Sequence, residues 1–256
     1  MRTFLVALCH SGIALAEVRE LSTDRPDQTE SPYSVPKGMF QLEMDFGTLT
    51  RDTDGNVVTE TINLAPFNLK YGLGEHTDLQ FVFDNWSQET QRIGRTKIVT
   101  QGMGDLTVRL KQNLWGNDSG STALAVMPFV TVPLNASDLG RDQAEAGLIV
   151  PFGWNLPNGF YLGLMTEWDW LNDENGGHKN AWFNTITLGA DITSKLACYA
   201  EFTATVFDNG DPWQGTVDGG LTYALKDNVQ LDLGCNFGIT RSAPDFQPFV
   251  GITLRY

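Results

Sequence analysis

Phe246-Gln247-Pro248-Phe249-Val250-Gly251-Ile252-Thr253-Leu254-Arg255-Tyr256 shows the alternation on which the interpretation of the fold is based. From Phe246 to Tyr256 every second residue is apolar, and the residues between are mostly polar or small. A period of two is typical of a β-strand with one apolar and one polar face. The last strand of a soluble β-sandwich would show the same period. The kind of sheet therefore has to follow from the rest of the chain.

Segments with the same alternation recur from Gly38 onward. We expect twelve strands, at residues 38–49, 62–71, 77–84, 105–114, 122–132, 146–156, 160–170, 181–191, 196–206, 215–225, 229–239 and 246–256. An even number of strands allows a sheet to close into a barrel with both ends of the chain on one side, as in single-chain bacterial outer-membrane barrels. The pattern thus favours an all-β, antiparallel transmembrane barrel over residues 38–256.

The connections between these strands alternate in length. Those on one side are short, at 72–76, 115–121, 157–159, 192–195 and 226–228, whereas those on the other are generally longer and rich in Asp, Asn, Gly and Ser, at 50–61, 85–104, 133–145, 171–180, 207–214 and 240–245. Short periplasmic turns and longer extracellular loops are typical of outer-membrane barrels. A loop as long as 85–104 would be unusual in a soluble sandwich. Tryptophans predicted near both ends of the strands fit two aromatic girdles.

The first 37 residues carry two different signals. Residues 1–16 combine Arg2, an apolar run from Phe4 and a small-x-small site that ends at Ala16, which predicts a secretory signal peptide. No later apolar run reaches the roughly 18 residues that a membrane-spanning helix needs. Residues 17–37 are polar and rich in proline. We expect them to form a periplasmic segment that folds into the barrel mouth, with Arg25 paired to lumen carboxylates; a disordered leader is the alternative.

Composition excludes several kinds of function. The formal net charge of -14 argues against nucleic acid as a partner, because phosphate binding needs clustered basic residues. No metal-ligand spacing and no phosphate-binding glycine motif occurs, so no metal and no cofactor is expected. Past the signal, the histidines are His76 and His178, both in predicted connections. A barrel-borne hydrolase would need a serine and a histidine adjacent on the wall, and we expect no catalytic residue.

Charged residues at inward positions form the candidate site. A Lys or Arg facing lipid at mid-membrane would cost about 2–4 kcal/mol, so we expect these side chains to face the lumen. They are Glu43, Asp45, Arg109, Lys111, Glu201, Asp232 and Arg255. Glu43 and Asp45 lie near the middle of the first strand and Arg109 and Lys111 near the middle of the fourth. We therefore predict that these four meet across the lumen, either as structural ion pairs or as a constriction that filters solutes.

The sequence also resembles a known family, labelled as the meta-pathway of phenol degradation and regarded as outer-membrane transporters. The matching pieces are residues 23–32, 36–43, 71–73, 102–106 leading to Lys111, 218–223 and 228–234. The resemblance implies an outer-membrane barrel that moves small aromatic or otherwise hydrophobic molecules. It also implies a fixed role for the motif that contains Asp24, Arg25 and Asp27, and it supplies no catalytic residues.

We accordingly expect a β-barrel in the bacterial outer membrane that passes small organic solutes passively. Its expected partners are outer-membrane lipid, the solute, and the barrel-insertion machinery, because the strand that ends on Tyr256 resembles the C-terminal strand of such barrels. Two alternatives remain open. One is a structural or adhesive barrel with a sealed lumen, and the other is a barrel-borne hydrolase.

Overall fold

The computed structural model describes residues 18–134, 139–173 and 176–256, so the predicted signal peptide at 1–16 lies outside the described residues. The described chain forms fifteen strands and one 3-10 turn, η1 (Pro157–Gly159). The strands are β1 (Phe40–Asp54), β2 (Val57–Leu64), β3 (Phe67–Gly72), β4 (Thr77–Phe83), β5 (Trp86–Ile93), β6 (Thr96–Gly102), β7 (Leu106–Trp115), β8 (Thr122–Val132), β9 (Glu145–Leu156), β10 (Phe160–Asn172), β11 (His178–Asp191), β12 (Leu196–Phe207), β13 (Gln214–Lys226), β14 (Val229–Gly238) and β15 (Phe246–Arg255). Within these ranges no helix is long and apolar enough to cross a membrane.

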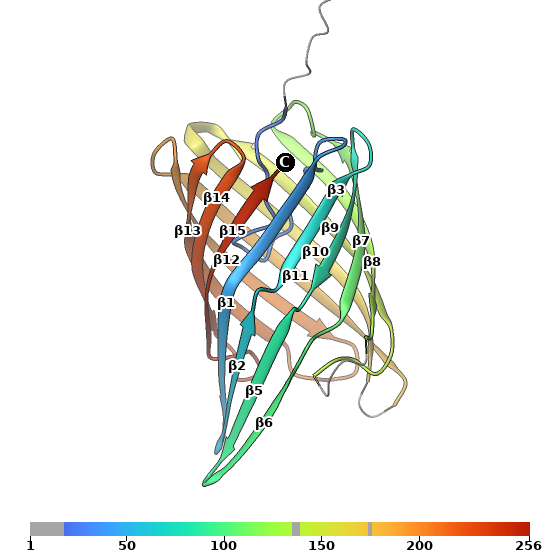
Figure 1. Ribbon diagram of the computed structural model, residues 1–256, viewed down its shortest axis with the longest axis vertical. Helices are drawn as coiled ribbons and strands as arrows, with labels where there is room; N and C mark the ends of the chain where they lie inside the picture. Colours follow the sequence, from blue (N-terminus) through green and yellow to red (C-terminus); the bar gives the residue numbers. More distant parts are fainter. Residues whose placement is uncertain (1–17, 135–138, 174–175) are drawn as a thin grey trace, which may run out of the picture.

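Twelve of the strands close into an antiparallel barrel (Figure 1). The ring runs from β15 through β14 and onward to β7, then through β4 and β3 to β1, which pairs back to β15. Backbone hydrogen bonds between Phe40 and Tyr256, at 2.7 and 2.8 Å, complete the closure. The prediction of a closed twelve-stranded barrel is confirmed.

The barrel is polar inside and apolar outside. In β15, Gly251, Thr253 and Arg255 are buried, whereas Val250, which precedes them on the opposite face, is 44% exposed. Lys70 and Lys111 are among the largest fully buried side chains. Aromatic side chains are exposed near both ends of the strands, including Trp168, Trp170, Trp182 and Trp213 at one end and Trp115, Trp154, Phe160 and Tyr256 at the other. This is the distribution that a lipid-facing surface with two aromatic girdles requires.

Two predicted loops are in fact strands. Residues 50–61 continue β1, turn at Gly55 and return as β2, while residues 85–104 contain the β5–β6 hairpin, which turns at Gly94. Both glycines have a φ of 60°, the left-handed conformation that tight hairpins need. β-Branched residues such as those at Val57-Val58-Thr59 form the strands between these turns. The predicted strand 62–71 is also two strands, β2 and β3, interrupted at Ala65-Pro66, where Ala65 has a φ of 51°.

The end of β1 together with β2, β5 and β6 forms a small sheet that we call the extension. It continues the barrel wall past the rim, at the end opposite to Tyr256, and projects beyond the neighbouring loops (Figure 1). The turns at the Tyr256 end are short. In outer-membrane barrels the short turns are periplasmic, so the extension is extracellular.

Candidate functional site: the plugged lumen

Residues 18–37, which we call the plug, enter the barrel at the periplasmic end and fold back inside it before β1 begins (Figure 1). The segment contains no helix or strand, which agrees with its three prolines, Pro26, Pro32 and Pro36. Backbone pairing with the wall is limited to a single bridge between Lys37 and Gly72. Side-chain contacts therefore hold the plug in place.

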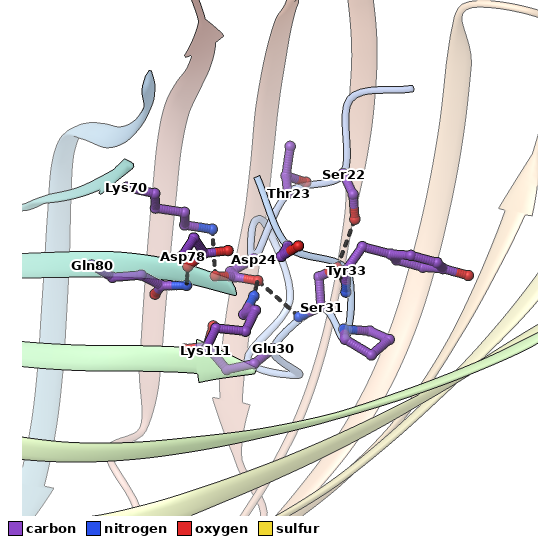
Figure 2. Close-up of polar contacts among 12 residues, drawn as sticks. Ser22, Thr23, Asp24, Glu30, Ser31, Tyr33, Lys70, Asp78, Gln80 and Lys111 are labelled. Carbon is purple, nitrogen blue, oxygen red and sulfur yellow. Dashed lines mark hydrogen bonds and ion pairs between the residues drawn. The ribbon is translucent and has the colours of Figure 1, made fainter. Parts of the chain in front are cut away.

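Asp24 lies at the centre of these contacts (Figure 2). Lys70 of β3 forms ion pairs with both Asp24 and Glu43, and Lys111 of β7 lies 2.9 Å from the other Asp24 oxygen. The backbone N–H of Ser31 donates to the same oxygen at 2.8 Å. Burial alone would raise the pKa of this plug carboxyl, but Lys111 and Lys70 hold it well below its usual range. Asp24 thus supplies the negative charge that two buried lysines require.

Arg25 contacts the adjoining part of the wall, which consists of β1, β15 and β14. Its guanidinium donates two hydrogen bonds to Asp232 of β14, at 2.7 and 3.2 Å, and lies 2.6 Å from Asp45 of β1. It also lies over the ring of Phe249, 5.8 Å from the ring centroid. A guanidinium matches a carboxylate through two parallel hydrogen bonds, which fixes orientation as well as charge. The peptide bond between Arg25 and Pro26 is cis.

The inner turn of the plug contacts two further walls. Glu30 forms an ion pair with Arg109 of β7 at 2.5 Å. The backbone N–H groups of Gln28 and Thr29 donate to Glu201 of β12 at 2.8 and 2.9 Å. Each of these wall charges therefore has its partner on the plug.

Many of the wall charges that contact the plug are grouped by sign, although Asp78 on β4 and Arg255 on β15 are exceptions. The basic side is formed by β3 and β7, with Lys70, Arg109 and Lys111, and faces the plug carboxylates. The acidic side is formed by β1, β12 and β14 and faces Arg25 and two plug N–H groups. A buried charge is tolerated only when it is paired and hydrogen-bonded. Without the plug, much of this wall would consist of unpaired charges.

The predicted site residues all contact the plug, although not as expected. The predicted ion pairs across the lumen between β1 and β7 do not form, because Asp24, Arg25 and Glu30 lie between the two strands and take the wall charges instead. Arg255 donates to the plug carbonyl oxygens of Arg19 and Glu20 at 2.6 and 2.9 Å. Whether these residues also line a constriction stays a prediction.

Sequence reasoning missed Lys70 and Glu30. Lys70 lies between Leu69 and Tyr71 in a predicted strand, so its inward position could have been read from the alternation. Glu30 belongs to a segment without periodicity, and no local pattern indicates that it would face Arg109.

Glycines allow the plug to approach the wall. A Cβ atom at Gly72 would overlap the backbone carbonyl of Pro36, and one at Gly251 would overlap the Arg25 guanidinium. Only glycine leaves room for such an approach. The wall is therefore shaped around the plug as well as charged to match it.

Two cavities lie on either side of the plug. The periplasmic one has a volume of about 760 Å³, and its lining includes Tyr33, Tyr161, Tyr199 and Asp27. The second, of about 250 Å³, lies towards the extracellular side between Asp45, Thr48 and Asn236. Burial, and then the carboxylates of Asp218 and Asp24, raises the pKa of the plug residue Asp27 to about 7. Arg25 and Pro26 line both cavities.

An apolar strip lies on the lumen side of β8 to β11. Met127, Ile149 and Met165 are buried there, and Phe129 and Phe183 pack against them. The backbone N–H of Glu30 lies 3.3 Å from the Met165 sulfur, so the plug lies against this strip as well. The lumen thus has an apolar wall in addition to its basic and acidic ones.

The two histidines lie at opposite ends of the barrel. His76, in a periplasmic turn, is 4.0 Å from Asp118, and the ring of His178 stacks on Trp170 with 3.7 Å between centroids. His76 lies in a connection as predicted, whereas His178 is the first residue of β11 and not part of the predicted loop 171–180.

Comparison with known proteins identifies the family. A family model described as "Putative MetA-pathway of phenol degradation" matches residues 23–256. The chain belongs to this family. The match begins inside the plug and includes the whole barrel, which confirms the resemblance seen in the sequence. A comparison with curated proteins found no match.

Solved structures with a similar fold are outer-membrane barrels. The NanC porin gives a TM-score of 0.53 at 10% identity, with 84% of this chain and 98% of the porin covered. The translocator domain of the autotransporter NalP from Neisseria meningitidis gives a TM-score of 0.53 at 12% identity, with 86% of this chain and 89% of that domain covered. The β-domain of the Bordetella autotransporter BrkA gives a TM-score of 0.52 at 11% identity, with 86% of this chain and 100% of that domain covered. Together with the apolar outer surface, the fold places the protein in the bacterial outer membrane.

Proposed function

We propose that the protein is an outer-membrane channel through which small organic solutes pass down their gradients, and that the plug is its gate. One observation carries the proposal. Arg25 and Pro26 line both the periplasmic and the extracellular cavity, so the two spaces face each other across this part of the plug. A displacement of the plug at these residues would join the cavities into one path.

The chemistry of the two spaces favours aromatic or otherwise hydrophobic solutes. Tyr33, Tyr161 and Tyr199 line the periplasmic cavity, whose volume of about 760 Å³ is within the range of small-molecule pockets. The apolar strip around Ile149 and Met165 lies behind the plug. The family description points to phenol degradation, which agrees with a solute that has one aromatic ring.

In this proposal the charged residues of the wall hold the gate closed. Arg109 and Lys111 bind the plug through Glu30 and Asp24, so replacing both with alanine would loosen the plug as well as widen the lumen. No residue is assigned a catalytic role, and passive transport needs no cofactor.

A sealed barrel with a structural or adhesive role is the second candidate. The number of buried ion pairs between plug and wall favours it, because each pair raises the cost of moving the plug. The extension would then be the functional part, as a binding surface outside the cell.

Solute uptake into proteoliposomes separates these functions. We expect vesicles with the full chain to take up benzenesulfonate, an aromatic anion that stays ionised and therefore crosses lipid slowly, faster than vesicles without protein. A sugar of similar size serves as a control for size. Uptake no faster than in protein-free vesicles, for every solute of a panel of phenols, aromatic acids, fatty acids and sugars, would contradict the channel and favour the sealed barrel.

A further inference from the structure

The extension carries charges of opposite sign on its two faces. Register places Arg51 opposite Glu60, and Arg92 opposite both Val58 and Lys97, all on the face that continues the outer surface of the barrel. We call this face the basic face and define it by Arg51, Arg92 and Lys97. The acids Asp52, Asp54 and Glu89 lie at alternate positions on the other face, which continues the lumen wall.

The cations of the basic face are in excess over their partners. Glu60 pairs with Arg92 at 2.5 Å and with Arg51 at 3.9 Å, and it is the acidic side chain that the described strands place on this face. Arg92 and Lys97 are exposed and lie directly opposite each other on β5 and β6. Like charges at directly opposed positions destabilise a sheet, so this arrangement calls for an anion from outside the chain.

The basic face begins where the lipid-facing surface ends. Leu49, Ile62 and Leu64 are exposed on the same face and lie on the barrel side of the charged rows, which also contain Val58 and Val99. With a rise of about 3.4 Å per residue, Arg51 lies about 7 Å beyond Leu49, and the row of Arg92 and Lys97 about 13 Å beyond it. Barrel strands tilt by about 40°, so the corresponding heights above Leu49 are about 5 and 10 Å. The head-group layer is about 5–8 Å thick on each side of the membrane, so Arg51 lies within it, and the long side chains of Arg92 and Lys97 reach it from just above.

We propose that the basic face binds the phosphate groups of an anionic lipid in the outer leaflet, whose acyl chains pack against Leu49, Ile62 and Leu64. Charge complementarity supports this occupant, because a chain with a net charge of -14 presents three cations and one acid on this one surface. Continuity with the apolar wall favours a lipid over a soluble anion. The extension would thereby be held against the membrane surface.

The test uses the full chain in nanodiscs of phosphatidylcholine mixed with lipid A, a bisphosphorylated glycolipid. The measured quantity is the enrichment of lipid A over phosphatidylcholine in the lipid retained by the purified barrel. Each Lys or Arg near an anionic membrane surface strengthens binding to the anionic lipid by about fivefold. Since Glu60 offsets one of the three cations, we expect the variant Arg51→Gln/Arg92→Gln/Lys97→Gln to lower the enrichment at least about tenfold.

Three control variants test whether the charge of the basic face causes the enrichment. Arg51→Lys/Arg92→Lys conserves charge and should keep the enrichment, and Glu60→Gln should raise it by removing the competing carboxylate. Arg241→Gln removes a cation from another extracellular loop and should have little effect. Heat-modifiable migration on gels verifies that each barrel is folded.

Unchanged enrichment in the triple variant would overturn the proposal, as would equal losses in the triple and the charge-conserving variants. Inorganic phosphate is then added as a competitor. Its failure to release the retained glycolipid is expected if the acyl chains contribute to binding. Complete release would show a simple anion site and contradict a lipid ligand.

Discussion

Lys70 shows most clearly how a single residue connects the wall to the plug. Its ammonium group is fully buried and contacts two carboxylates, Asp24 on the plug and Glu43 on β1. Lys111 supports Asp24 from the neighbouring side. Burying these charges is costly, and the cost is offset only while every partner is present.

Replacing Lys70 with methionine should therefore release the plug. The variant leaves Glu43 without its cation, and breaking a buried ion pair from one side costs about 3–5 kcal/mol. We expect faster cleavage by protease at residues 20–32 in the membrane-embedded protein. Lys226→Met removes an exposed lysine and should leave the cleavage rate unchanged. Equal rates in wild type and the Lys70 variant would show that this contact does not hold the plug.

The orientation of a single side chain, into the lumen or towards lipid, was predictable where the residue lies in a strand. The alternation of apolar and polar residues oriented Glu43, Asp45, Arg109 and Lys111 correctly, because a strand alternates faces at every residue. It did not identify their partners. Asp24 and Glu30 lie in a segment without periodicity, and their positions depend on how the plug folds inside a closed wall.

At the scale of elements, the plug and the extension differ in how they are held. The plug has almost no backbone pairing to the wall and depends on side chains. The extension is a continuous hydrogen-bonded sheet, since β2 pairs with β1 and β5 pairs with β2. The sheet should be stable without help from the lumen, and the barrel should not need β5 and β6.

Deletion of the β5–β6 hairpin tests that independence. The backbone of Gly104 already donates to Asp84 at 2.8 Å, so a short turn can join β4 to β7 after residues 86–102 are removed. We expect the shortened protein to assemble and to show the same shift on unheated gels as the full chain. Failure to assemble would mean that the extension contributes to barrel formation.

The extension also shows where sequence reasoning fails. Loops 50–61 and 85–104 contain Asp, Asn and Gly, which indicated turns, but each turn is confined to the residues around Gly55 or Gly94. The intervening residues are β-branched or alternate weakly because neither face of the extension is fully buried. A sheet without a buried face leaves little periodic signal.

In the whole molecule, pairing between β1 and β15 closes the barrel, and Tyr256 lies at the periplasmic end of this seam. Tyr256 exchanges two backbone hydrogen bonds with Phe40 at the seam between β15 and β1. Its side chain is 71% exposed, at the level of the periplasmic girdle. The twelve barrel strands were predictable because each shows its own alternation of apolar and polar residues. The contacts of the plug inside the lumen were not predictable, because the plug has no such pattern.

Deleting Tyr256 should lower the yield of assembled barrel sharply, because both seam hydrogen bonds and the terminal aromatic are lost. Tyr256→Phe keeps the backbone bonds and the ring and should assemble like wild type. Assembly is measured as the heat-modifiable fraction in isolated outer membranes. Normal assembly of the deletion variant would mean that neither the seam nor a terminal signal for the insertion machinery depends on this residue.

A plug that acts as the gate, as proposed above, lets solutes pass only when it moves relative to the wall. The hydroxyl groups of Thr29 and Thr185 lie 2.5 Å apart, one on the plug and one on β11, so cysteines at these positions can form a disulfide that tethers the plug. Cys198 and Cys235 are free and would first be replaced by alanine. Ser22 and Ser31, with hydroxyl groups 2.6 Å apart within the plug, provide a matched pair that forms a disulfide without tethering it to the wall.

The gate is tested by benzenesulfonate uptake into proteoliposomes that contain the Thr29→Cys/Thr185→Cys protein, before and after addition of a reductant. We expect the oxidised tether to reduce uptake to the rate of protein-free vesicles and the reductant to restore it, while the Ser22→Cys/Ser31→Cys protein transports in both states. Uptake that is equally fast with the tether closed would contradict the proposed gating by the plug, because the solute would then cross the barrel without any movement of the plug.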